Sequence, residues 1–564
     1  MEKRVILAIV ICAGIMFAWA QFFPGTPPEP PPTAQPAATV PGQPTAATQA
    51  GAPTTTAATA PAAVAPAAPV AVAVPEQETV IETPVQRFVF TNRGAVLKHA
   101  QLREPKYLSR RNDPTSGIDL VRTTEASQAP LRISFPDAQV QAPPDAAWQV
   151  VPQAAGADPN QVTYRAETAA IAVEKRFIVD NAHYRIHLDV TVQNRTGAAQ
   201  DHHLGIQVAG FQDPEAKGSF LTAATGNTSS LLCHLGGSIT RDDIETLSKE
   251  PWQGKTGPVS WIGADEKFFL TAVVPYPEPR PQDRTCKSTS YGPTAAAGTL
   301  EFAARSLAPG AHTRYSFAVY VGPKIIADLE EVRPAKMDVR LSDSVDVSLA
   351  FISRPMLGLL KLFHGVVKNW GVAIILLTIF IRLLTFYPTQ KSLMSAKKMQ
   401  KLGPKMAAIR KKYEGDRQRQ SAETMNLYKA HGVSPFGGCL PSLIQMPIWI
   451  ALYSTLNYAV ELYRSPFIFH IKDLTAKDPY YITPLLMGGV MFVQMKMSPT
   501  SPDNQQQAMM AIMMPVMFTA FSLVLPSGLA VYMLTSYLIG ILQQLWVNHL
   551  DRKANAPAPA PGRA

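Results

Sequence analysis

The chain has 564 residues, of which 46% are hydrophobic, and its formal net charge is +10 at pH 7. This length allows several domains, and long apolar blocks on both sides of a polar middle are typical of a membrane protein with a large soluble part. The four cysteines form no CxxC pair, which excludes a zinc ribbon and a thioredoxin-type site.

Residues 1–23 are predicted to form an N-terminal transmembrane anchor. The basic start "MEKR" precedes a mostly apolar run from Val5 to Phe23. A cleaved signal peptide is the alternative, because "AWA" at 18–20 matches an A-x-A cleavage pattern, although the apolar run continues beyond it. Residues 24–78 are rich in Pro, Ala and Thr and are predicted to be a disordered linker, because they hold too little apolar surface to fold.

Residues 79–330 predict a β-sandwich domain. Stretches such as "VEKRFIVDNAHYRIHLDVTVQN" and "HTRYSFAVYVG" alternate apolar with polar residues and are rich in Val, Ile, Phe, Tyr and Thr, as in half-buried strands. Cys233 and Cys286 lie in this region. They could pair if the domain meets an oxidising compartment, and the sequence alone leaves the pairing open.

No catalytic or metal-binding motif stands out in this polar middle. Residues 254–256 read "GKT", like the end of a phosphate-binding loop, but Lys249 stands where that loop requires glycine. The local histidines lack cysteine or carboxylate at ligand spacing, so surface strand and turn positions are expected for His183, His187, His202 and His203. The sequence therefore predicts neither an enzyme nor a metal or cofactor site.

Residues 348–369 predict an amphipathic helix lying in the membrane interface. Its apolar face is interrupted by Arg354, Lys361 and His364, so the segment is too polar to span a bilayer. A buried helix of a soluble domain is the alternative. Five apolar blocks follow and predict five membrane spans: 371–388, 436–460, 481–497, 508–525 and 528–547.

Residues 389–435 predict a basic cytoplasmic helical hairpin, with helices near 390–412 and 417–430. They carry eleven basic and three acidic residues, a net charge of +8. By the positive-inside rule this segment, the N-terminus and the tail 548–564 are cytoplasmic, and the β-domain is exported. The hairpin could bind anionic lipid or acidic and RNA-rich partners, or its charge could simply set topology. Its only aromatic residues, Tyr413 and Tyr428, argue against base-specific nucleic-acid readout.

Arg382 lies inside the apolar block 371–388. A guanidinium at membrane depth costs about 2.5–3.5 kcal/mol on insertion scales. Helical spacing places Thr378, Arg382, Thr385 and Thr389 on one face. Two other spans carry polar stripes of their own: Gln445 and Trp449, and Tyr532, Ser536 and Gln543. The stripes predict a shared water-filled cavity in which Arg382 has no internal partner and can bind one that enters from outside. The alternative is that the Arg382 side chain extends to the headgroup region.

Several stretches in this order resemble the YidC family of membrane-protein insertases, in its Gram-negative form with a large periplasmic domain. They include "NWGVAIILLTIFIR", "YPTQKSLMSAKKMQKLGPKM", "GGCLPSLIQMPIWIALY", "KDPYYITPLLMG", "QMKMSP" and "LPSGLAVYMLTSYL". The resemblance implies a multi-domain inner-membrane protein: an uncleaved N-terminal anchor helix, a β-sandwich periplasmic domain and an α-helical polytopic core of five helices. It also implies a hydrophilic groove, open to the cytoplasm and to lipid, that inserts and helps fold nascent membrane proteins without a cofactor.

The resemblance also implies roles for individual residues. Arg382 matches the groove arginine and Thr378 its neighbour, and Tyr532 matches the first of two tyrosines, the second being Met533 here. The candidate groove and client-binding residues are therefore Arg382, Thr378, Gln445, Met446, Trp449, Tyr532 and Met533. The candidate residues of the cytoplasmic hairpin are Lys397, Lys398, Lys401, Lys405, Arg410, Lys411 and Lys412.

The expected partners are nascent membrane-protein clients, the Sec translocon, ribosome or signal-recognition machinery at the cytoplasmic face, and anionic phospholipids. A secondary transporter of an anionic solute that binds Arg382 is the alternative function, but it predicts internal repeats and matching broken helices, and the sequence shows no repeat. A scaffold that only tethers the β-domain would leave the three polar stripes unexplained.

Overall fold

The computed structural model describes residues 75–554 apart from 215–227, 434–439, 498–504 and shorter gaps at 110–112, 114–115, 124, 137–139, 154–155, 157, 279–281, 346 and 348. The predicted anchor (1–23), nearly all of the predicted linker (24–78) and the end of the tail lie outside the described residues.

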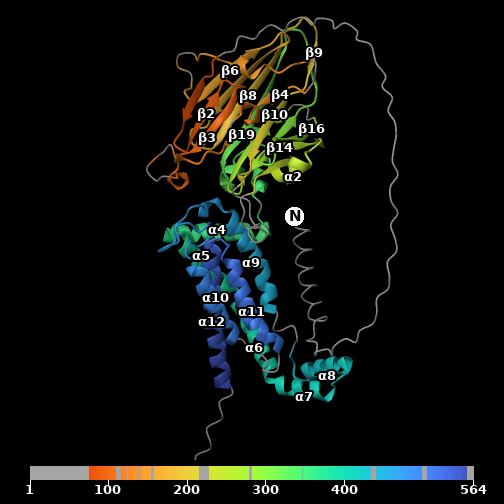
Figure 1. Cartoon of the computed structure of the whole chain (residues 1–564), viewed down its shortest axis with the longest axis vertical. Coiled ribbons are helices and arrows are strands. Elements are labelled where there is room, and N and C mark those ends of the chain that lie inside the picture. The colour runs from red at the N-terminus through yellow and green to blue at the C-terminus, as the bar shows by residue number, and fades with distance from the viewer. Residues whose placement is uncertain are drawn as a thin grey trace, which may run out of the picture. The chain divides into compact units, whose positions relative to one another are not determined.

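The first strand of the β-domain begins at Glu78, one residue before the range predicted for the sandwich, and its last strand ends at Pro323 (Figure 1). Its largest sheet has nine strands in the order β12-β11-β14-β15-β19-β8-β7-β6-β5, and a second sheet has five in the order β13-β16-β17-β10-β4. The strands of the large sheet are β5 (Gln149–Val150), β6 (Gln161–Glu167), β7 (Ile171–Val179), β8 (Arg185–Asn194), β11 (Ser230–Leu235), β12 (Ser238–Asp243), β14 (Val259–Asp265), β15 (Phe269–Pro275) and β19 (His312–Pro323).

The remaining strands complete three smaller sheets. The five-stranded sheet contains β4 (Ile133–Ser134), β10 (Gly205–Phe211), β13 (Lys255–Gly257), β16 (Arg284–Ser290) and β17 (Ala295–Glu301). A three-stranded sheet contains β1 (Glu78–Glu82), β2 (Gln86–Thr91) and β3 (Val96–Leu102), and a two-stranded sheet pairs β9 (Gln200–His202) with β18 (Arg305–Leu307). Short helices α2 (Ile244–Lys249) and α3 (Ile326–Glu330) flank the strands.

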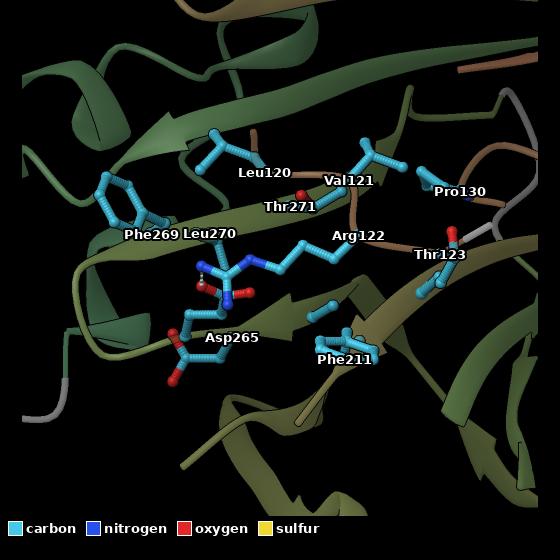
Figure 2. Close-up of a pocket in the computed structure, with 14 residues that line it drawn as sticks. Leu120, Val121, Arg122, Thr123, Pro130, Phe211, Asp265, Phe269, Leu270 and Thr271 are labelled. Carbon is cyan, nitrogen blue, oxygen red and sulfur yellow. Dashed lines mark ion pairs between the residues drawn. The ribbon is translucent and has the colours of Figure 1, made fainter. Parts of the chain in front are cut away.

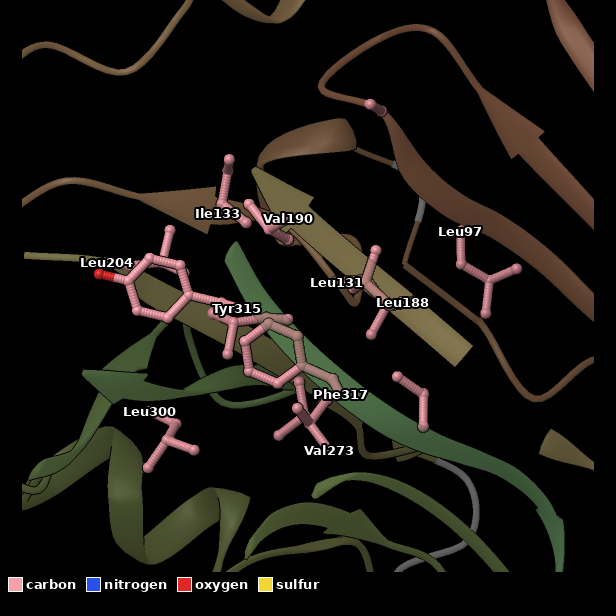
Figure 3. Close-up of a cluster of buried hydrophobic side chains, with 14 of the residues drawn as sticks. Leu97, Leu131, Ile133, Leu188, Val190, Leu204, Val273, Leu300, Tyr315 and Phe317 are labelled. Atoms are coloured by element: carbon pink, nitrogen blue, oxygen red, sulfur yellow. The ribbon is translucent and has the colours of Figure 1, made fainter. Parts of the chain in front are cut away.

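Alternation along the strands builds the core of the domain. In the central strand β8, inward-facing residues are buried and most outward-facing ones are only half-buried. The antiparallel register sets Leu188 opposite Phe317 and Val190 opposite Tyr315, so large apolar side chains meet across the strands (Figure 3). The two large sheets pack closely where Gly298 of β17 lies against Ile262 of β14.

A disulfide joins Cys233 of β11 to Cys286 of β16 and therefore links the nine-stranded to the five-stranded sheet. Both cysteines are fully buried. The structure thus pairs the two cysteines whose pairing the sequence left open, and a disulfide is compatible with an oxidising compartment such as the periplasm.

A small cavity in the β-domain is lined by charged and apolar side chains, among them the largely buried carboxylate of Glu266. Its volume is about 20 Å³, enough for one water molecule, and Arg122 extends across it on the side of Asp265 (Figure 2). The Arg122 guanidinium lies 3.4 Å from the Glu266 carboxylate, whose side chain is 13% exposed. Burial raises the pKa of Glu266 to about 7; the charge of Arg122 opposes this shift and that of Asp265 adds to it.

This raised pKa predicts that stability depends on pH. The folded state holds the Glu266 proton more tightly than the unfolded chain does, where the pKa of this carboxyl group has its ordinary value of 4.5. Protonation of Glu266 therefore contributes about 3 kcal/mol at most to the free energy of unfolding. This contribution is complete below the unfolded-state pKa and is lost as the pH rises through about 7. We expect Glu266→Gln to flatten this part of the pH profile, measured by pulse proteolysis of the β-domain in urea. An unchanged profile would contradict the assignment.

The C-terminal region is helical, as predicted (Figure 1). Its helices are α4 (Ala350–Val367), α5 (Trp370–Leu384), α6 (Phe386–Lys401), α7 (Gly403–Lys412), α8 (Arg417–Ala430), α9 (Leu440–Tyr458), α10 (Ile482–Met497), α11 (Gln505–Ser522) and α12 (Ser527–Ala554). Contacts join α5 to α4 and α12, α9 to α4, and α10 to α11 and α12. Their shared apolar cluster includes Leu360, Ile374, Leu377, Leu452 and Leu529.

The expectation that Thr378, Arg382, Thr385 and Thr389 lie on one face of a single helix is wrong for Thr389. Helices α5 and α6 meet at an angle of 61° with a break at Thr385. Pro388 explains the break, because it lacks the N–H that would donate to the Leu384 carbonyl and its ring crowds that carbonyl. Thr389 therefore lies beyond the bend from Arg382. The first predicted hairpin helix is likewise divided at Leu402, just before Gly403 and Pro404.

Two helices of the described residues are long and apolar enough to cross a membrane: α4 and Ser527–Leu550 of α12. The bent pair α5–α6 is a third candidate if it counts as one span, and α10 and Ile512–Ser522 of α11 are shorter apolar helices. The six-span topology and the interfacial position of α4 stay predictions. Exposed apolar side chains on α4, namely Phe351, Leu362 and Val366, point to a lipid-facing surface in either case.

Candidate functional site

Arg382 lies in the last turn of α5, and its side chain is half-buried against α12. Its Nε donates a hydrogen bond of 3.0 Å to the Ser536 hydroxyl oxygen, and a terminal guanidinium nitrogen donates to the same oxygen. Among the described residues, the hydrogen bonds found for this guanidinium go only to that uncharged hydroxyl. Its positive charge is therefore held in place but not neutralised by a carboxylate.

A second contact brings α9 to the same stretch of α12. Gln445 Nε2 donates to the Tyr532 hydroxyl over 2.8 Å. Tyr532 lies one turn before Ser536 on α12 and also shares a side-chain hydrogen bond with it. The hydrogen bonds thus run from Gln445 through Tyr532 and Ser536 to Arg382. We call these four residues the polar network; it joins α5, α9 and α12.

Two other predicted groove residues have local partners. The Thr378 hydroxyl donates to the Ile374 carbonyl of its own helix over 2.7 Å, and the residue is 1% exposed. Trp449 stacks on Tyr453 with ring centroids 5.7 Å apart. Its indole N–H is buried and has no hydrogen-bond partner among the described residues. Trp449 lies one turn after Gln445 on α9, so its unused donor is on the same side of that helix as the polar network.

The remaining candidate groove residues, Met446 and Met533, and the stripe residue Gln543 have other surroundings on α9 and α12. Met446 is half-buried on α9, and Met533 is buried in the apolar cluster of the helices. Gln543 Nε2 donates to the Phe386 carbonyl over 3.2 Å, where α6 begins, whereas the hydrogen bonds of Arg382 to other described residues go to Ser536. Gln543 thus connects α12 to the start of α6, beyond the bend.

Gln494 on α10 is a further polar residue near the site, and it was not predicted from the sequence. The Gln494 amide lies against Gly540 of α12, where a Cβ atom would come within 2.3 Å of the amide nitrogen. Gly540 is one turn beyond Ser536, so this glutamine approaches the same side of α12 as the polar network. Two features of the sequence could have identified this contact: a glutamine in a short apolar span, and a glycine four residues after Ser536.

The predicted hairpin residues divide between α6 and α7. Lys397 Nζ donates to the Val547 carbonyl of α12 over 3.4 Å and so helps to hold α6 on the core. A small apolar cluster that contains Leu402 and Tyr428 packs α7 against α8. The other predicted basic residues are exposed: Lys398, Lys401, Lys405, Arg410, Lys411 and Lys412.

The described residues contain no group of His, Cys, Asp or Glu that could hold a metal ion. The site's chemistry is thus that of a half-buried cation with uncharged hydrogen-bonding neighbours. Such a site can bind an anionic or strongly polar group and release it, but the polar network contains no nucleophile paired with a base.

Two family models together match most of the chain. The model for the 60Kd inner membrane protein matches residues 362–554, and the model for the YidC periplasmic domain matches residues 78–359. The membrane protein insertase YidC of Anaeromyxobacter dehalogenans strain 2CP-C is 38% identical over 100% of this chain and 99% of its own length. The membrane protein insertase YidC of Syntrophus aciditrophicus is 34% identical over 97% of this chain and 99% of its own length.

Solved structures give more distant similarity. A crystal structure of an active YidC insertase with its first transmembrane domain resolved is 19% identical, with a TM-score of 0.36 over 86% of this chain and 94% of that one. A galactose mutarotase-like protein from Lactobacillus casei is 10% identical, with a TM-score of 0.31 over 43% of this chain and 100% of that one.

The family models and the full-length relatives confirm the resemblance and the fold class predicted from the sequence. They also confirm that the protein is not an enzyme, because its relatives are insertases. The chain belongs to the YidC family of membrane protein insertases, and it is an inner-membrane protein with a β-sandwich periplasmic domain and a helical membrane core.

Proposed function

We propose that this insertase passes client segments along a polar groove formed by α5, α9 and α12, and that Arg382 transiently binds the acidic or polar flank of the client. The observation that carries the proposal is the half-buried guanidinium, whose hydrogen bonds within the described part of the chain go only to the Ser536 hydroxyl. A cation without a carboxylate partner inside an apolar helix bundle is costly and is typical of a substrate pathway.

The energetics support a groove rather than a sealed channel. A client carboxylate that enters the hydrocarbon core alone costs about 2.5–3.5 kcal/mol on insertion scales. Pairing with Arg382 in a water-filled groove lowers that cost, because the client carboxylate stays hydrated and has the guanidinium as its counter-ion. Each Leu or Ile of the client that then moves into lipid contributes about −0.3 to −0.6 kcal/mol. Partitioning therefore supplies the drive, and no nucleotide is required.

The cytoplasmic hairpin is the entrance in this proposal. Its exposed basic side chains on α6 and α7 attract anionic lipid headgroups and acidic or RNA-rich surfaces such as a ribosome, at about 1 kcal/mol per basic residue near a charged membrane. Six spans with both termini in the cytoplasm complete the topology. The insertase acts alone or together with the Sec translocon.

A reconstitution assay tests the proposal. The purified full chain is placed in liposomes with one small client of the phage-coat type, and protease protection of the client measures insertion. We expect protection above that of protein-free liposomes without added nucleotide. Uptake of a labelled anionic solute is measured in parallel. Solute uptake without client protection would contradict the proposal and favour a transporter.

A further inference from the structure

A tight turn projects from the segment that links α9 to α10. The Phe467 N–H donates to the Ile471 carbonyl over 3.0 Å, and the Ile471 N–H donates to the Ile468 carbonyl over 3.1 Å. Ile468 and Phe469 form the tip of this turn, and Phe469 is 93% exposed. Phe469 also has φ +49°, a left-handed conformation that a bulky side chain rarely adopts. Exposure of the Phe469 ring to water is unfavourable, and so is the left-handed backbone conformation of this residue.

The turn is fixed to the start of α5. The Phe467 ring lies against Gly371, where a Cβ atom would come within 2.0 Å of the ring. Asn369 Nδ2 donates to the Phe467 carbonyl over 3.0 Å, and Asn369 also caps α5 by accepting from the Val372 N–H. The tip is therefore held at the N-terminal end of α5, which directly follows the periplasmic domain and α4 in the chain.

Other exposed side chains indicate that the end of the helical core that carries the tip lies at the membrane surface. Tyr480 and Tyr481 are 67% and 39% exposed and directly precede α10, and tyrosines are enriched at the headgroup level of membrane proteins. On α4, which ends three residues before α5, Leu362 and Val366 are 62% and 77% exposed. The exposed apolar tip thus continues the lipid-facing surface of the helical core.

We infer that Ile468 and Phe469 insert into the periplasmic leaflet and anchor the α9–α10 segment at a fixed depth. Lipid fits better than a protein partner, because two side chains offer far less area than a specific protein interface buries. The inference rests on the proposed topology, in which α5 enters the membrane from the periplasm, but it does not depend on the role of Arg382.

The anchor has a consequence for the groove. The same segment is fastened to the start of α12, since the Ser527 N–H donates to the Ala476 carbonyl over 2.7 Å and the Gly528 N–H to the Leu474 carbonyl over 2.9 Å. It also caps α10, because Asp478 accepts from the Thr483 N–H over 2.8 Å. The tip therefore sets the depth of α5 and α12, the helices that carry Arg382 and Ser536.

The test places an environment-sensitive fluorophore on the tip. Phe469→Cys is labelled with NBD in a full chain that also carries Cys12→Ser and Cys439→Ser, and the protein is reconstituted in liposomes with or without brominated phospholipid. Lys472→Cys is the matched control, because Lys472 is exposed in the same segment. We expect brominated lipid to quench the label at position 469 about twofold and to have little effect at position 472.

Two results would overturn the inference: a label at position 469 that remains in water, or one that is shielded but not quenched by brominated lipid, as a protein contact would give. Insertion of a phage-coat-type client is measured on the same liposomes, with and without Arg382→Glu. A tip that is not quenched in a protein whose insertion still requires Arg382 would contradict the anchor alone. A quenched tip with insertion that does not require Arg382 would contradict the groove proposal alone.

Discussion

Replacing Arg382 with Glu is expected to abolish insertion of clients whose translocated flank is acidic. The variant places a carboxylate beside the Ser536 hydroxyl and repels the client flank that the guanidinium would bind. Loss of about 1.4 kcal/mol in binding already lowers occupancy tenfold, and charge reversal removes more than that. Protease protection of the client in liposomes is the measurement, with circular dichroism to verify that the helices remain folded.

Two controls make this result specific to charge. A client with a neutral flank should insert through Arg382→Glu at a rate close to that of the wild type. Arg382→Lys should retain part of the activity on acidic clients, because it keeps the charge but loses the planar guanidinium that directs two nitrogens at one hydroxyl. Normal insertion of acidic clients by Arg382→Glu would show that charge pairing is not a step of the pathway.

Removing the disulfide should produce the largest loss of stability in the β-domain. Cys233 and Cys286 are separated by 53 positions, and closing a loop of this length stabilises a fold by about 4 kcal/mol in the chain-entropy model. We expect Cys233→Ala/Cys286→Ala to lower the urea midpoint of the β-domain, measured by pulse proteolysis of the full-length protein. Alanine avoids placing unpaired hydroxyl groups in the fully buried site.

A reductant provides the matched control for that variant. It should lower the midpoint of the wild-type protein by a similar amount and leave the double-alanine variant unchanged. A wild-type midpoint that does not respond to reductant under denaturing conditions would contradict a stabilising role for the bond.

Much of the helical region could be predicted because local signals mark its boundaries. Helix α8 spans Arg417–Ala430, the range predicted from the sequence, because Asp416 caps its start by accepting from the Arg419 N–H. Helix α10 spans Ile482–Met497, which agrees to within a residue with the predicted block. The breaks at Thr385 and Leu402 were missed because apolar or basic composition outweighed the nearby prolines.

Side-chain partners far apart in the sequence could not be predicted in the same way. Lys175 lies on the inner face of β7, where only the fold supplies acceptors for its ammonium group, including the Leu131 carbonyl at 2.7 Å. Burial lowers the pKa of this lysine. Helical spacing likewise identified polar faces with Arg382 and Ser536, whereas their hydrogen bond joins residues 154 positions apart. A single sequence shows which face is polar but not which faces meet.

The central claim is that the Arg382 guanidinium is reached by water from the cytoplasm. Ser536→Cys places a thiol beside the intact arginine, in a chain that also carries Cys12→Ser and Cys439→Ser. Its reaction with a membrane-impermeant thiol reagent is measured in vesicles of both orientations. We predict modification from the cytoplasmic side only. Protection of the thiol from both sides, or modification from the periplasmic side, would contradict the claim.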